Sequence, residues 1–142
     1  MNNIIERIQQ TYAALNKDTV GGDLLANLYA DQVIFVDPLH RIETLPNLQA
    51  YFKALYKNVS HINFEFHKTL SDDTTAFLAW DMTFVHPKLN GGRAIVVPGT
   101  SQVQFADGKI IHHQDYFDSN QMLFSHIPVL KQMIGLIKKR IN

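Results

Sequence analysis

The sequence contains no cysteine among its 142 residues. Disulfides, thiolate metal sites and a cysteine nucleophile are therefore excluded, and the composition fits a reducing compartment. The chain also lacks net charge, because 13 Lys and Arg residues balance 13 Asp and Glu residues. Without a basic excess there is no overall field to gather nucleic acid or acidic substrates, so nucleic acid is not an expected partner.

Long apolar runs are missing as well. The first ten residues, MNNIIERIQQ, carry charge where a signal peptide needs an unbroken apolar segment, and no stretch approaches the length of a membrane span. We therefore expect a cytoplasmic protein. Hydrophobic residues make up 46% and charged residues 18% of the chain, which is typical of a globular protein. Its length predicts one domain spanning residues 1–142.

Three helices are predicted before most of the sheet. Apolar residues at helical spacing predict a first helix over 4–17. A short second helix is predicted over 23–29, with Asp23 as its cap, after a pair of glycines that break the chain. A third helix is predicted over 44–55, with Thr44 as its cap and a proline in its first turn.

From residue 61 onward, apolar residues alternate with polar ones, which predicts strands with one buried face. The predicted strands are 33–37, 61–70, 74–86, 93–105 and 110–117. Pro98 and Gly99 suit a bulge or bend, and the Asp107–Gly108 pair predicts a hairpin turn. Long strands joined by short turns predict an α+β fold, in which the N-terminal helices cover one face of a strongly curved antiparallel sheet.

The strand that ends at Asp37 raises the first question of function. Pro38 follows directly; it cannot donate a hydrogen bond to a strand partner, and it favours extended geometry for the residue before it. The carboxylate of Asp37 is therefore expected at a strand end, either in solvent or at the edge of a pocket.

The order of these elements, with "YAD" before the first strand, "DP" at its end and a "DGKI" hairpin before the last strand, resembles the nuclear transport factor two-like superfamily. Within it, the chain looks most like the bacterial SnoaL-like and ketosteroid-isomerase-like proteins, over residues 3–120. The resemblance implies a cone whose curved sheet wraps a deep apolar pocket. Because the superfamily includes isomerases, cyclases, dehydratases and inert binding or dimerisation modules, it implies the fold more specifically than the function.

The resemblance also implies roles for individual residues. In ketosteroid isomerases the acid of the "DP" step is the general base and a tyrosine on the first helix polarises the substrate carbonyl, which places Asp37 and Tyr12 in those roles. A protonated Asp completes that site, but Ser101 stands in its place, and its hydroxyl would donate more weakly to an enolate. SnoaL-like cyclases instead carry an acid/base Asp on the last strand, which points to Asp115 with His113 beside it on the pocket wall. Either acid can therefore be the base.

The walls of the implied pocket are predicted from strand periodicity. Ile111, His113, Asp115 and Phe117 share one face by period two, and the resemblance favours this face as the inner one. Aromatic residues at strand spacing are further candidates for core or pocket wall. These are Trp80, Phe64, Phe66, Phe84 and Phe105.

Metal binding is a weaker hypothesis for the last strand. His112, His113, Asp115 and Asp118 are residue types that ligate metals, but the two adjacent histidines point to opposite faces of a strand and cannot share one ion without a bulge. We therefore expect neither a metal nor an organic cofactor.

Two features predict contacts beyond the pocket. Residues 128–141 predict an amphipathic helix whose apolar side packs on its own domain or on a dimer partner. Two alternatives are that the helix lies on a membrane surface, which its basic end favours, or that it forms a lid over the pocket. Strands 74–86 and 93–105 carry a semi-apolar second face around Asp81, which predicts a homodimer.

The sequence thus predicts a domain that binds a small apolar or carbonyl-bearing ligand. One hypothesis is an acid–base isomerase, cyclase or dehydratase, in which Asp37 or Asp115 moves a proton while Tyr12 orients the oxygen. The other is a non-catalytic ligand-binding or dimerisation module, which the replacement of the third acid by Ser101 favours.

Overall fold

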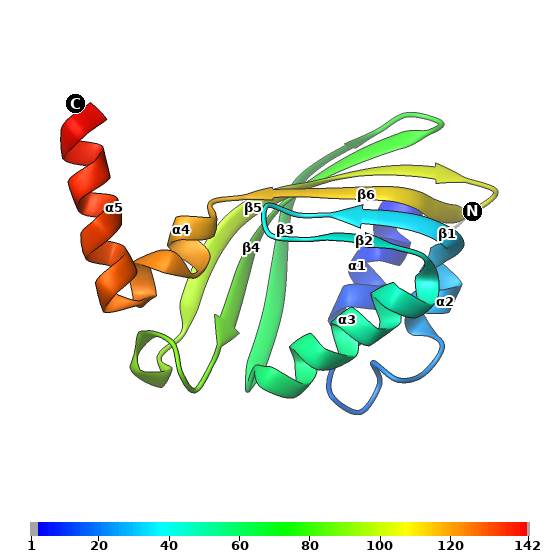
Figure 1. Ribbon diagram of the computed structural model, residues 1–142. Helices are drawn as coiled ribbons and strands as arrows, with labels where there is room; N and C mark the ends of the chain where they lie inside the picture. The colour runs from blue at the N-terminus through cyan, green and yellow to red at the C-terminus, as the bar shows by residue number, and fades with distance from the viewer. Residues whose placement is uncertain (1–2, 142) are drawn as a thin grey trace.

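The structure is a computed structural model that describes residues 3–141. Figure 1 shows a strongly curved sheet with three N-terminal helices packed against one face and a C-terminal helix at the far end. The helices are α1 (Ile4–Ala14), α2 (Leu24–Leu28), α3 (Leu45–Asn58), α4 (Ser119–Met122) and α5 (Pro128–Ile141), with short 3₁₀ turns η1 (Asn90–Gly92) and η2 (Phe124–His126). The strands are β1 (Tyr29–Val36), β2 (Arg41–Glu43), β3 (His61–Ser71), β4 (Thr75–Val85), β5 (Ile95–Ala106) and β6 (Lys109–Phe117). The predicted α+β cone is confirmed.

The six strands form one sheet in the order β2-β1-β6-β5-β4-β3. All neighbouring strands are antiparallel except β1 and β6, which run parallel. The sequence predicted an antiparallel sheet and missed this parallel pair. The reason is connectivity: the chain passes through α3 and four strands between β1 and β6, so no hairpin joins them. In this parallel register Val36 pairs with Gln114, which brings the two following acids, Asp37 and Asp115, to the same edge.

The core lies between the helices and the inner face of the sheet. Isoleucines of α1 and the residues Leu48 and Phe52 of α3 are buried against it. Strand β4 follows the predicted alternation, with five buried side chains separated by more exposed ones. These five are Ala76, Leu78, Trp80, Met82 and Phe84. Neither predicted cap holds, because the side chains of Asp23 and Thr44 make no capping hydrogen bond.

A β-bulge in β6 overturns part of the predicted period-two face. Gln104 pairs with His112, but Phe105 pairs with Ile110, so Ile111 is an extra residue in β6. As a result Ile110 is fully buried, whereas Ile111 is 41% exposed instead of sharing the inner face. The two residues beyond the bulge that matter most for the site, His113 and Asp115, do lie on the inner side.

No bulge occurs at Pro98 and Gly99, because the register between β4 and β5 runs through them without a shift. The glycine has a different use. A Cβ atom at Gly99 would lie 2.3 Å from the Cη2 atom of Trp80, so only glycine lets the indole lie flat against β5. The sequence therefore uses Gly99 to place Trp80 rather than to interrupt the strand.

Helix α5 is present as predicted, but it stands apart from α1, α2 and α3 (Figure 1). It contacts η2, and much of its apolar stripe is exposed. The exposed residues are Met133, Leu136, Ile137 and Ile141. These four side chains are left uncovered by the rest of the described chain. Across residues 3–141, no helix is both long enough and apolar enough to cross a bilayer.

Candidate active site

A cavity of about 380 Å³ opens between α1, α3 and the inner face of the sheet. Its wall is mainly apolar, and its lining includes four of the seven predicted site residues, Tyr12, Asp37, Trp80 and Asp115. The remaining three are elsewhere: Ser101 and His113 are buried and hydrogen-bonded to Asp115, and Phe105 packs against the main core. The structure thus brings both candidate acids and the candidate tyrosine to one cavity.

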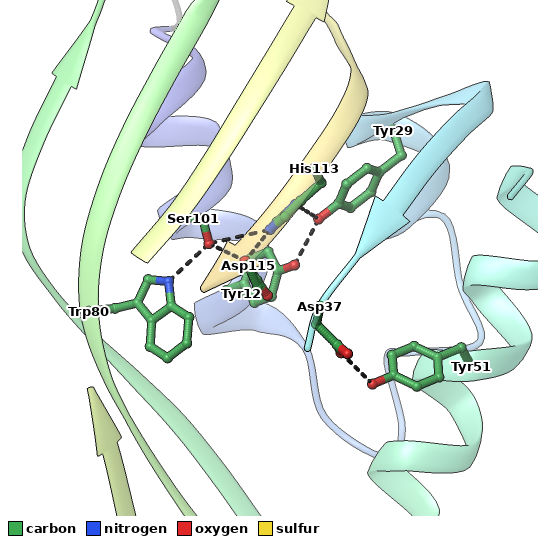
Figure 2. Close-up of polar contacts among 8 residues, drawn as sticks. All are labelled: Tyr12, Tyr29, Asp37, Tyr51, Trp80, Ser101, His113 and Asp115. Carbon is green, nitrogen blue, oxygen red and sulfur yellow. Dashed lines mark hydrogen bonds and ion pairs between the residues drawn. The ribbon is translucent and has the colours of Figure 1, made fainter. Parts of the chain in front are cut away.

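Asp115 is held from one side only. Its Oδ1 atom accepts a hydrogen bond from the Ser101 hydroxyl at 2.5 Å and lies 2.7 Å from Nε2 of His113. Figure 2 shows both partners converging on this carboxylate. The other oxygen, Oδ2, accepts no hydrogen bond from the described residues, and the side chain is 15% exposed. Asp115 therefore presents one unengaged carboxylate oxygen to an apolar cavity.

The proton of Ser101 has a fixed direction. The indole N–H of Trp80 donates to Ser101 Oγ at 2.9 Å, and an indole nitrogen can only donate. The hydroxyl of Ser101 therefore accepts from Trp80 and uses its single proton toward Asp115. The register supports this arrangement, because Ser101 on β5 pairs directly with Asp115 on β6. Ser101 consequently supports Asp115 and is not oriented as a donor to a ligand.

A second branch leads from Asp115 back to the cavity wall. Nδ1 of His113 lies 2.8 Å from the Tyr29 hydroxyl, which in turn lies 2.7 Å from the Tyr12 hydroxyl. Burial is the main cause that raises the pKa of Tyr12 well above the usual tyrosine value, with Tyr29 and Asp115 adding to it. Burial also raises the pKa of Tyr29. Both phenols therefore stay neutral at ordinary pH. We call Tyr12, Tyr29, Trp80, Ser101, His113 and Asp115 the buried network (Figure 2).

Asp37 lies in a different environment. Its Oδ1 accepts from the backbone N–H groups of Leu39 and His40 at 2.8 and 2.7 Å, and its Oδ2 accepts from the Tyr51 hydroxyl at 3.3 Å. Nδ1 of His40 lies 3.1 Å from Oδ1. The carboxylate thus closes the tight turn between β1 and β2, and both oxygens have partners. We call Asp37, His40 and Tyr51 the turn cluster.

Burial, and then the neighbouring Asp37, raise the pKa of Tyr51, so its phenol stays neutral and donates to the carboxylate. The side chain of Asp37 is only 6% exposed. A ligand that approached Asp37 would therefore compete with these donors for the carboxylate oxygens.

Three residues of these clusters, Tyr29, His40 and Tyr51, were missed by the sequence reasoning. Tyr51 carried a readable signal, because a tyrosine on the apolar stripe of a helix buries its ring and needs a partner for its hydroxyl. His40 follows Asp37 in a turn where an Asp side chain commonly accepts from the backbone. Tyr29 carried no such signal, since its partner His113 is 84 positions away.

The structure offers no obvious place for a metal ion within the part of the chain that it describes. Among residues 3–141, no group of three or more His, Asp or Glu side chains is arranged to hold one. The side chains of His113 and Asp115 contact each other.

Comparison with known proteins gives one family match and many similar structures. A family model described as SnoaL-like domain matches residues 8–113. No curated protein matches the chain by sequence. Similar solved structures include a nuclear transport factor two-like protein of unknown function from Burkholderia pseudomallei, with a TM-score of 0.74 and 15% identity over 89% of this chain and 99% of that one.

Two further structures carry names that suggest activities. An LEH-like epoxide hydrolase from M. tuberculosis has a TM-score of 0.71 and 15% identity, and the match covers 96% of each chain. A putative SnoaL-like polyketide cyclase from Jannaschia has a TM-score of 0.70 and 12% identity over 87% of this chain and 90% of that one. At such identities the likeness establishes the nuclear transport factor two-like fold and leaves the activity open.

Proposed function

Because the chain belongs to the SnoaL-like domain family, we propose that it binds a small apolar carbonyl compound and catalyses a proton transfer on it, with Asp115 as the general base. Asp115 is one of the two acids that the sequence left open for this role. The proposal covers the isomerase, cyclase and dehydratase alternatives together, since all three begin by removing a proton from a carbon next to a carbonyl.

One observation carries this assignment: Asp115 is anchored through Oδ1 and free at Oδ2. A general base needs an unoccupied lone pair that faces the substrate within hydrogen-bonding reach. Donors on Oδ1 fix the orientation of the carboxylate, and the cavity that Asp115 lines is mainly apolar. Asp37 lacks this combination, because both of its oxygens already accept hydrogen bonds.

In the proposed step, Oδ2 of Asp115 takes a proton from the carbon next to the carbonyl. The electron pair of the C–H bond forms the enolate double bond, and negative charge develops on the carbonyl oxygen. Tyr12 lines the same cavity and orients that oxygen. Return of the proton to another carbon gives isomerisation, loss of a neighbouring hydroxyl gives dehydration, and attack of the enolate on a second carbonyl gives cyclisation.

The test uses nitrobenzisoxazole, whose ring opens when a base removes its carbon-bound proton and whose phenolate product is coloured. We expect the wild-type protein to open the ring and the Asp115→Asn variant to be slower by about 10²- to 10⁴-fold, the usual contribution of a general base. Affinity for nitroindole, an unreactive analogue, should change by no more than a few-fold. Equal turnover by wild type and Asp115→Asn would contradict the assignment.

The second hypothesis, binding without catalysis, is favoured by one observation. Two of the three groups expected of a ketosteroid-isomerase-like site are committed elsewhere, Asp37 to its turn and the proton of Ser101 to Asp115. Trp80 is the single tryptophan and lines the cavity, so its fluorescence reports binding directly. Binding of nitroindole with no ring opening of nitrobenzisoxazole would favour this second function.

We also propose that the protein is a homodimer joined through the outer face of the sheet. Phe77, Val96 and Tyr116 are 44%, 51% and 56% exposed, and they lie on three adjacent strands, β4, β5 and β6. Large exposed apolar side chains on neighbouring strands of a sheet often mark an interface. Light scattering should give the mass of a dimer for the wild type and of a monomer for Phe77→Lys. A wild-type monomer at tens of micromolar would refute the dimer.

A further inference from the structure

The branch of the buried network from Tyr12 to Asp115 is an unbroken row of hydrogen bonds. The three contacts, Tyr12 to Tyr29, Tyr29 to His113 and His113 to Asp115, measure 2.7, 2.8 and 2.7 Å. Each contact holds one proton, and each phenol has only one proton to give. The direction of every bond in the row is therefore set by a single choice, namely whether Nδ1 of His113 carries a proton.

When His113 is neutral, the row points away from the cavity. Its one N–H, on Nε2, donates to the carboxylate of Asp115, so Nδ1 is an acceptor. Tyr29 must then donate to His113, and Tyr12 must donate to Tyr29. In this state the only proton of Tyr12 is used inside the protein, and Tyr12 can offer a ligand nothing but lone pairs.

When His113 is protonated, the row points toward the cavity. Nδ1–H now donates to Tyr29, which frees the Tyr29 proton for Tyr12. The Tyr12 hydroxyl is left with a proton that has no other acceptor among the described residues. Asp115 remains a carboxylate paired with the imidazolium, so the same state holds both a base and a hydrogen-bond donor.

We propose that Tyr29 and His113 are positioning residues that make the Tyr12 hydroxyl a donor to a ligand oxygen only while His113 is protonated. This deepens the function proposed above and rests on it for its catalytic meaning, because an enolate oxygen needs a donor at Tyr12 while Asp115 acts as the base. The ligand class that this state selects is a carbonyl or oxyanion, and neutral His113 disfavours it.

Several other titratable or polar groups surround His113 and the cavity. Tyr12 of α1, Tyr29 of β1 and Asp115 of β6 contact His113 or its partners directly, and Ser101 of β5 lies 3.3 Å from Nε2. Farther out are Tyr56 of α3, whose pKa burial raises to about 12, the turn cluster, and His86 on the cavity wall. Of these, His40 and His86 are the two further histidines that line the cavity.

The experiment measures binding of dinitrophenolate, an oxyanion that remains ionised across the range used, between about pH 6 and about pH 9. Quenching of Trp80 fluorescence reports its affinity. For the wild type, affinity should fall by about tenfold or more as pH rises, since a hydrogen bond to a charged oxygen is lost.

Three variants test whether the row of hydrogen bonds, and not another titratable group, causes the pH dependence of binding. Tyr12→Phe removes the donor, so binding should be weak and independent of pH. Tyr29→Phe removes the group that commits the Tyr12 proton, so binding should stay tight with the pH dependence lost. His40→Gln removes a titratable neighbour outside the row and should retain the wild-type slope. A flat wild-type profile, or a Tyr29→Phe profile that follows the wild type, would overturn the proposal.

The two proposals fail separately in these measurements. Oxyanion affinity does not require turnover, so it tests the row even if the protein is not an enzyme. Ring opening of nitrobenzisoxazole tests Asp115 as the base even if the hydrogen bonds of the row never reverse. Urea unfolding of Tyr12→Phe and Tyr29→Phe, which each lose one oxygen atom, verifies that both variants are folded at every pH used.

Discussion

Asp37 and Asp115 line the same cavity and lie at the same edge of two parallel strands, yet the chain treats them differently. In the turn cluster, backbone and side-chain donors engage both oxygens of Asp37. In the buried network, donors engage one oxygen of Asp115 and leave the other unengaged. An acid that lines a pocket is therefore not yet a candidate base; what separates these two acids is that only Asp115 keeps an oxygen without a hydrogen-bond partner among the described residues.

The largest stability effect that separates the two acids is expected in the turn cluster. Asp37→Ala deprives the backbone N–H groups of Leu39 and His40 of their acceptor, so the free energy of unfolding should fall by about 2 kcal/mol. Asp37→Asn keeps an acceptor oxygen and should cost less than about 1 kcal/mol. Urea unfolding measures both. Equal stability of Asp37→Ala and wild type would show that Asp37 does not hold this turn.

A smaller effect is expected in the buried network, where a substitution should lower the turnover rate. Ser101→Ala removes one of the two donors to Asp115 and leaves the Trp80 N–H without its acceptor. Turnover of nitrobenzisoxazole should fall by about tenfold, the value of one hydrogen bond to a charged group. Thr100→Ala, a neighbouring change on the other face of β5, should have no such effect. If both variants were equally active, the support from Ser101 would be unimportant.

Much of this arrangement could be predicted from the sequence, because it depends on local periodicity. Helical spacing located α1 and α3, and strand alternation placed Trp80 on the inner face of β4. The resemblance then brought Tyr12, Asp37 and Asp115 to one cavity, where the structure has them. Their catalytic roles were beyond the reach of periodicity and remain proposals.

The rest could not be predicted, because it depends on register between distant strands. The extra residue at Ile111 inverts the alternation within β6, and no local pattern announces it. The parallel pairing of β1 with β6 brings Tyr29 to His113, although the two residues are far apart in the chain. Hydrogen-bond partners of this kind, which distinguish the two acids, become visible only in three dimensions.

The most direct test of the central claim compares Asp115→Asn and Asp37→Asn in one assay. Each change replaces one carboxylate oxygen by an amide nitrogen, so the two variants differ only in which acid loses its basicity. We expect Asp115→Asn to open nitrobenzisoxazole about 10²- to 10⁴-fold more slowly than wild type, and Asp37→Asn to stay within a few-fold of it. The reverse order, with Asp37→Asn inactive and Asp115→Asn unaffected, would contradict the assignment of Asp115 as the base.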